Sequence, residues 1–452
     1  MSTALLDKDL QVEVSYRQII KIALPISFAL LVPQVNFITN NIFLGQLGEE
    51  ELGTAGITGV YYLIFAAIGF GLNNGLQALI SRRAGENRVD EIGKLFSQGV
   101  RIACFIAVSG ILITYFVAPY IFSFALHDSG RKQEAMEFLR IRIWGLPFLY
   151  IYQMRNALLV GTNQSRFLIA GTLAETIANI FFDYTLINGV WGFPRLGFNG
   201  AAYASIIAEA TGMFIVFLVI HFKGISKRFS LYQGFRYDKK NTSLILSQSA
   251  PLIFQHAISI ISWVFFYILI EHHGKRDLAI SNSMRNIFGF FGVFTWSFAA
   301  TSNTMVSNVI GQGKKEQVIP LISKIIRISL CIAVMVALLL NLFPQVFLSI
   351  YGQGDQFIAD AIPVVRIVSS ALLIMSFSTV WLNAVTGTGN SHVNLMIEVV
   401  AIIFYCIYNY IVLEYLALPI TWGWASEWLY WSILFSLSYF YIRSGRWKGK
   451  VI

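Results

Sequence analysis

The sequence predicts an all-α integral membrane protein with twelve transmembrane helices, arranged as two pseudo-symmetric six-helix lobes. Three observations lead to this prediction: the composition, the recurrence of long apolar runs, and an internal repeat. Of the 452 residues, 56% are hydrophobic and only 13% are charged. A soluble domain could not cover so much apolar surface, so we expect the lipid bilayer to surround this chain.

Apolar runs of about 20 residues recur along the whole chain, and each ends at glycine, proline or charged residues. This is the length that a helix needs to cross the hydrocarbon core of a bilayer. The predicted spans are 22–44, 55–80, 98–125, 141–160, 167–189, 199–221, 245–270, 279–306, 322–350, 361–385, 393–414 and 424–442.

The two halves of the chain repeat with an offset of 226 residues. This offset places Pro25 on Pro251, Gly48 on Gly274 and Ser81 on Ser307 without a gap. Further matches are Gly85 with Gly311, Arg101 with Arg327, Arg140 with Arg366, Gly161 with Gly387 and Tyr184 with Tyr410. We therefore predict an amino-terminal lobe at 1–226 and a carboxyl-terminal lobe at 227–452. Because six spans return the chain to the same side, the repeats should be parallel, with their axis along the membrane normal.

Lys and Arg are concentrated in alternate loops and in both termini. The positive-inside rule assigns these segments to the cytoplasm. The loop residues that carry this assignment are Arg82, Arg83, Arg88, Lys94, Lys223, Lys227, Arg228, Arg236, Lys239, Lys240, Lys314 and Lys315. We expect a multi-pass protein of the plasma membrane, the inner membrane of a bacterium, with both termini inside. The net charge of +9 is a topology signal, and no nucleic-acid partner is expected.

No catalytic or cofactor signature is present in the sequence. Neither a P-loop nor a Rossmann fingerprint occurs, and no nucleophile motif or metal-ligand spacing stands out. We therefore expect no enzyme activity, no metal site and no cofactor. Transport would be driven by an ion gradient or be passive.

The fifth span carries polar residues at helical spacing. Glu175, Asn179 and Asp183 recur every four residues, so they lie on one stripe of a helix. Acids are costly inside a bilayer, and such a stripe is expected to face protein. Asn36 and Asn40 in the first span and Ser205 and Glu209 in the sixth could supply facing oxygens for cation coupling. Their oxygens suit a monovalent cation, and a carboxylate removed from water can also carry a proton. The alternative is that Asp183 caps its helix or reaches the interface.

A second polar group lies in the seventh span and continues into an aromatic cluster. This mixture fits a cavity for a bulky amphiphile, although aromatic runs are more often packing residues. The residues that we assign to the substrate cavity are Asn36, Gln255, His256, Ser259, Trp263 and Asn282.

The repeat is chemically unequal at the proposed coupling positions. The position that corresponds to Glu175 is Ala401, and the position that corresponds to Asp183 is Asn409. This asymmetry points to the amino-terminal half for coupling.

Two segments of the first half resemble the multidrug and toxic compound extrusion (MATE) family. One runs from Pro25 to Gly48, and the other runs from Gly161 through Asp183 to Ser205. The second half carries similar marks at 279–282 and 304–307. The resemblance implies a two-lobed fold that exports amphiphilic, often cationic compounds in exchange for protons or sodium ions. It also implies a cation network at Asn40, Asn179, Asp183 and Ser205.

The sequence departs from the family pattern at three positions. Asn40 stands where many relatives have aspartate, and Ser259 stands where some have glutamate. The acid that some relatives place in the tenth span is missing here, and Met375 lies near that position. These departures leave Asp183, helped by Glu175, as the expected coupling acid. The leading hypothesis is a monomeric antiporter of small molecules. The rivals are a flippase for a lipid-linked saccharide or lipid precursor, and a binding or scaffold protein.

Overall fold

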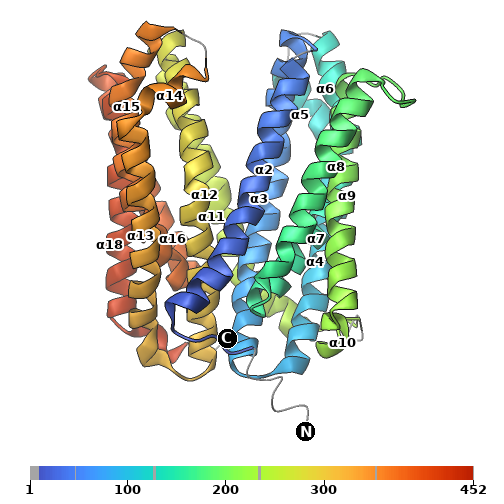
Figure 1. Cartoon of the computed structure of the whole chain (residues 1–452), viewed down its shortest axis with the longest axis vertical. Coiled ribbons are helices and arrows are strands. Elements are labelled where there is room, and N and C mark those ends of the chain that lie inside the picture. The colour runs from blue at the N-terminus through green and yellow to red at the C-terminus, as the bar shows by residue number, and fades with distance from the viewer. Residues whose placement is uncertain (1–9, 46, 126–128, 233–235, 352–353, 451–452) are drawn as a thin grey trace. The chain divides into compact units, whose positions relative to one another are not determined.

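A computed structural model describes residues 10–45, 47–125, 129–232, 236–351 and 354–450. Within these residues every regular element is a helix, and the helices form twelve long passages along the chain. Figure 1 shows these helices as coiled ribbons. The helices of the first half are α2 (Tyr16–Gly45), α3 (Glu49–Gly85), α4 (Val89–Phe116), α5 (Ala118–Ala125), α6 (Ser129–Arg142), α7 (Leu146–Gly161), α8 (Leu168–Asn188), α9 (Phe198–Phe222) and α10 (Ile225–Arg228). Those of the second half are α11 (Lys239–Glu271), α12 (Lys275–Gly311), α13 (Val318–Leu342), α14 (Pro344–Ser349), α15 (Asp355–Gly387), α16 (Ser391–Asn409), α17 (Ile420–Trp424) and α18 (Ser426–Arg443).

Eight of these passages are long and apolar enough to cross a membrane, among the residues that the structure describes. The other four passages contain α7, α8, α12 and α18. The helix α8 is more polar because it carries Glu175, Asn179 and Asp183. The membrane-spanning, all-helical prediction is thus confirmed, and the more polar helices include the one that carries the predicted acids.

The predicted boundaries were too simple at three spans. The third span divides into α4 and α5 at Val117, and the ninth divides into α13 and α14 at Phe343. Ahead of the fourth span lies the helix α6, which continues through a 3₁₀ turn at Ile143–Gly145 into α7. Pro344 explains the second break, because proline is favoured in the first turn of a helix and cannot continue the one before it.

The described chain divides into two compact units. One is Phe28–Ser249, and the other is Ala250–Ile452 together with Met1–Ser27. Each division lies within three residues of a repeat-related proline, Pro25 in α2 and Pro251 in α11. Both helices continue past their proline, which removes a backbone donor and favours a kink. The predicted lobe boundary at 226/227 stays a prediction, because the division of the units follows packing and not the repeat.

The segment before α2 packs within the second unit. Val12 N donates to Asn308 Oδ1 at 3.1 Å, and Asn308 Nδ2 donates to Leu10 O at 2.9 Å. Lys324 Nζ on α13 donates to Val14 O at 2.7 Å. These bonds hold residues 10–14 against α12 and α13.

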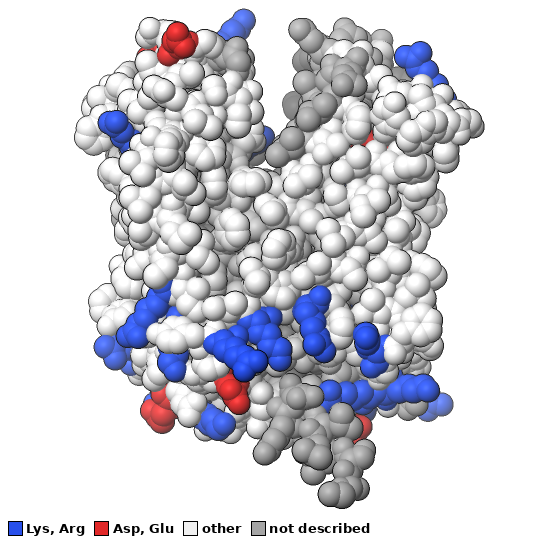
Figure 2. Space-filling model, viewed as in Figure 1, with Lys and Arg blue, Asp and Glu red and all other residues white. Residues whose placement is uncertain are grey.

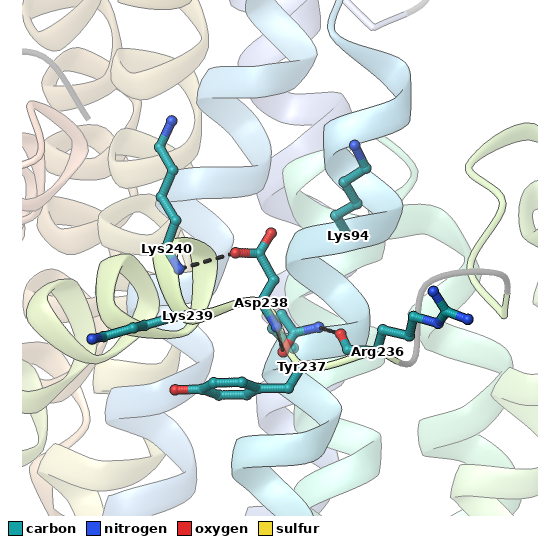
Figure 3. Close-up of a pocket in the computed structure, with 7 residues that line it drawn as sticks. Lys94, Arg236, Tyr237, Asp238, Lys239 and Lys240 are labelled. Carbon is teal, nitrogen blue, oxygen red and sulfur yellow. Dashed lines mark hydrogen bonds between the residues drawn. The ribbon is translucent and has the colours of Figure 1, made fainter.

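The segment between α10 and α11 packs in the equivalent way on α4 of the first unit. Gln98 Nε2 donates to Arg236 O at 2.8 Å, and Thr242 Oγ1 donates to Gln98 Oε1 at 3.2 Å. Asp238 caps α11, since its Oδ1 accepts from Lys240 N at 2.9 Å (Figure 3). An open hollow of about 450 Å³ lies here, lined by Lys94, Gln98, Arg236, Tyr237, Asp238, Lys239 and Lys240.

Lys and Arg side chains of each unit gather mainly toward one end of its helices on the face drawn in Figure 2. The lysines that line the hollow on α4 and α11 belong to the loops that the charge pattern assigns to the cytoplasm. The assignment of sides stays a prediction.

A substitution at Gly93 of α4 tests how the segment between α10 and α11 packs on that helix. A Cβ at this position would lie 1.9 Å from Phe229 O, a backbone atom next to α10. We expect Gly93→Ala to displace residues 229–231, break the 2.9 Å bond from Ser97 Oγ to Leu231 O, and destabilise the protein by about 1–3 kcal/mol. Thermal unfolding measures the loss of stability, and the rate of tryptic cleavage at Lys227 and Arg228 reports the displacement of the segment.

Gly59→Ala is the matched control, because no heavy atom lies within 4 Å of its added Cβ. Alanine favours a helix over glycine by about 1 kcal/mol, so this variant should be at least as stable as the wild type. Equal behaviour of the two variants would contradict the proposed packing.

Candidate functional site

The predicted coupling residues of α8 lie inside the first unit. Asp183 is fully buried and Asn179 is 3% exposed. Close packing of α8 on α9 makes this burial possible: Gly171 and Gly212 face each other, and a Cβ on either would lie 3.3 Å from the other's carbonyl oxygen. The stripe thus faces protein, as the spacing predicts.

Asn40 of α2 joins the two α8 residues. With its amide nitrogen turned toward them, Asn40 donates to Asp183 Oδ2, to Asn179 Oδ1 at 2.9 Å and to Asn36 O at 3.1 Å. The structure therefore brings three of the five predicted coupling residues into one hydrogen-bonded group. We call Asn40, Asn179 and Asp183 the α8 site.

Two oxygens at or near the α8 site lack a hydrogen-bond partner among the described residues: Asp183 Oδ1 and Asn36 Oδ1, both buried. Buried polar atoms are normally satisfied, so such atoms mark a place for a ligand, an ion or water. No described ion pair neutralises Asp183. The group has carboxylate and amide oxygens available and no fixed positive charge of its own.

No described hydrogen bond joins the other two predicted coupling residues to the α8 site. Ser205 on α9 is partly exposed, and no described hydrogen bond joins it to Asp183. Glu175 lies two turns before Asp183, against α9, where its Oε2 is 3.0 Å from the position of a Cβ on Gly212. Its neighbours are therefore different from those of Asp183.

A buried ion pair lies in the same unit. Arg142 at the end of α6 binds Glu209 of α9 through two bonds, of 2.5 and 2.9 Å. The guanidinium carbon also lies 3.8 Å from the centroid of the Tyr62 ring, and Tyr62 OH donates to Glu209 at 3.2 Å. Arg142 interacts electrostatically with Glu175 and Asp183 as well. Its two direct bonds go to Glu209, while its positive charge also acts on the carboxylates of Glu175 and Asp183.

The second unit has a buried carboxylate at Glu398 of α16, which is 1% exposed. Two of the predicted cavity residues bind it: Ser259 Oγ donates to Oε1 at 2.7 Å, and Gln255 Nε2 donates to Oε2 at 3.1 Å. Tyr430 OH of α18 also donates to Oε1. Gln255 and Ser259 therefore donate their hydrogen bonds to Glu398, an acid of their own unit.

Of the other four predicted cavity residues, Asn36 accepts a hydrogen bond from Asn40 through its backbone oxygen, and three have different surroundings. Trp263 packs on the aromatic core, with its ring centroid 6.1 Å from Tyr267 and 6.3 Å from Trp424. Asn282 is exposed and lines a separate hollow of about 270 Å³. His256 is partly buried on α11. No described hydrogen bond or ring contact joins these three residues to one another.

The sequence analysis missed two important residues. Arg142 was overlooked because it lies at the edge of the predicted fourth span. Glu398 was overlooked although it is an isolated acid in the apolar run MIEVVAIIF, so the rule that selected Glu175 also applies to it.

The MatE family model matches the chain twice, at residues 25–185 and 251–411. Both bounds of the second match lie 226 residues after those of the first, which confirms the internal repeat.

Two bacterial relatives are similar to this chain over different lengths. A probable multidrug resistance protein NorM of Thermotoga maritima is 23% identical over 96% of this chain and 94% of its own length. A protein of the same name from Synechocystis is 28% identical over 45% of this chain and 44% of its own length, so that match spans less than half of either protein.

Solved structures share the fold. A crystal structure of MATE in complex with MaL6 has a TM-score of 0.90 at 16% identity, covering 97% of this chain and 98% of its own. A multidrug resistance MATE family transporter in an outward-facing conformation has a TM-score of 0.88 at 17% identity, covering 97% of both chains.

Proposed function

Because the chain belongs to the MatE family, whose members include multidrug efflux transporters, we propose that it exports amphiphilic, cationic small molecules in exchange for a proton or a sodium ion. The family match covers most of the chain and shows the transporter class. The coupling ion and the substrate are our proposal.

The observation that carries the proposal is the state of Asp183. It is fully buried, accepts a hydrogen bond from Asn40 through one oxygen, and has no described partner at the other oxygen. An uncompensated carboxylate away from water costs several kcal/mol, and binding a cation or a proton removes that penalty. Asp183 would therefore favour the loaded state of the site.

Asn40 and Asn179 shape the ligand preference of the site in this proposal. Their amides can present either oxygen or nitrogen, so Asn40 can donate to an ionised Asp183 or turn its oxygen toward a bound cation. Oxygen ligands suit sodium, whereas a single carboxylate suits a proton. The site is compatible with either ion, and the exchange requires only that ion and substrate favour different states of the transporter.

The relatives' description as multidrug resistance proteins supports drug-like substrates for this chain. The bacterial origin of the two NorM relatives supports placement in a bacterial plasma membrane. We further propose that the transporter works as a monomer.

Transport by the purified protein in liposomes tests the proposal. A fluorescent organic cation is followed while a proton gradient, a sodium gradient or no gradient is imposed. We expect accumulation against the concentration gradient of the dye with one of the two ions and none without a gradient. Flux of the same rate under all three conditions would contradict ion coupling.

A further inference from the structure

Glu398 lies where three helices of the second unit meet. It belongs to α16, and its carboxylate accepts bonds from Gln255 and Ser259 of α11 and from Tyr430 of α18. All three partners are neutral donors. The group satisfies three of the acceptor positions of an ionised carboxylate without supplying a positive charge.

The surroundings of Glu398 contain no fixed cation in hydrogen-bond contact with it, among the residues that the structure describes. Titratable side chains around it or around its partners are Tyr430 and Glu427 on α18, Tyr405 on α16 and His256 on α11. Glu427 is itself buried at 2% exposure. Among the described contacts, an ionised Glu398 is therefore stabilised by dipoles alone, and its burial makes ionisation costly.

The hydroxyl groups that contact Oε1 of Glu398 can form hydrogen bonds with both the ionised and the protonated carboxyl group. Ser259 Oγ and Tyr430 OH both contact this oxygen, and they are in hydrogen-bond contact with each other. A hydroxyl can donate or accept. A proton on Oε1 therefore needs only the rotation of one hydroxyl, with no movement of heavy atoms.

Glu427 provides a contrast within the same helix bundle. Its described partner is Trp431 Nε1, which donates to Oε2 at 2.9 Å. An indole nitrogen can donate but cannot accept. The described partner of Glu427 thus cannot accept a hydrogen bond from a carboxylic proton, whereas Ser259 and Tyr430 at Glu398 can.

We propose that Glu398 is a proton-binding site of the second unit, distinct from the α8 site. A proton from water forms an O–H bond on the carboxylate, and the same bond breaks when the proton returns to water. Hydrogen bonds to a charged acceptor are about twice as strong as those between neutral groups. Proton binding would therefore weaken the attachment of α11, through Gln255 and Ser259, to α16 and α18.

The position of the site on α11 gives this change a mechanical consequence. Pro251 lies four residues before Gln255 inside α11 and removes one backbone donor there. A helix is most easily bent at such a point. Loosening the contact one turn after the proline would change how firmly this part of α11 is held within the unit.

Infrared difference spectra of the reconstituted protein, recorded as pH is varied, test the proposal directly. A protonated carboxylic acid has a carbonyl band that the ionised form lacks. We expect a titrating band in the wild type, its loss in Glu398→Gln, and its retention in Glu427→Gln. Proton counting by potentiometric titration should give one bound proton fewer for Glu398→Gln over the same pH range.

A second variant covers the case in which Glu398→Gln does not fold. Tyr430→Phe keeps the acid but removes one hydroxyl from Oε1, so we expect the titrating band to remain and to shift in frequency. If folded Glu398→Gln kept every titrating band of the wild type, or if Tyr430→Phe left all of these bands unchanged, the proposal would be overturned. The band should also persist in Asp183→Asn, so failure of the coupling proposal and failure of this one are measured separately.

Discussion

Asp183→Asn is expected to reduce gradient-driven transport to the level of liposomes without protein. The change keeps the shape of the side chain but removes the only carboxylate of the α8 site, so neither a proton nor a cation can neutralise a charge there. Substrate binding without a gradient should survive, because nothing else in the fold is altered. The measurement is dye accumulation in proteoliposomes under the gradient that drives the wild type.

Asp238→Asn is the matched control for this prediction. Asp238 lies in the same unit, but its carboxylate caps α11 by accepting from Lys240 N and Asn241 N. Asparagine caps a helix about as well as aspartate does, so transport should stay close to that of the wild type. Full gradient-driven transport by Asp183→Asn would rule out the α8 site as the coupling site.

Arg142→Met is expected to destabilise the protein by about 3–5 kcal/mol. The guanidinium forms two bonds to Glu209 and stacks on Tyr62, and the Arg142 and Glu209 side chains are only 13% and 9% exposed. Removing it leaves a buried carboxylate without a counter-charge. Thermal unfolding in detergent should show a large decrease in the transition temperature.

The double variant Arg142→Met with Glu209→Met separates charge from packing. It removes both charges, so we expect it to be more stable than Arg142→Met alone. The exposed control is Arg88→Met, since Arg88 is 53% exposed and its pair with Glu91 should contribute about 0–1 kcal/mol. If Arg142→Met were as mild as Arg88→Met, the inferred importance of the buried pair would be wrong.

Much of the fold could be predicted because a membrane imposes simple rules on a sequence. Apolar runs of fixed length mark the spans, and the repeat is visible because proline and glycine at turns keep their positions across 226 residues. The predicted helix ends failed where helices extend beyond the apolar run, as α3 does to Gly85 and α12 does to Gly311. Hydropathy describes only the part of a helix that lipid surrounds.

The candidate site was predicted where its residues share one helix. Asn179 and Asp183 are four residues apart, and the helical period alone places them together. Ser205 was associated with them by resemblance, and no described contact joins it to the group. Arg142 lies 67 residues before its partner Glu209, and Gln255 lies 143 residues before its partner Glu398. No local pattern connects positions so far apart in the chain.

The sequence by itself determined the membrane class, the twelve spans, the duplication and the polar stripe of α8. Each of these follows from composition or from a period that neighbouring residues share. Only the tertiary structure decided which acid has a partner: Arg142 neutralises Glu209, neutral donors surround Glu398, and one oxygen of Asp183 has no described partner. The physical reason is that a buried charge depends on atoms a few ångströms away, and helix packing alone brings those atoms together.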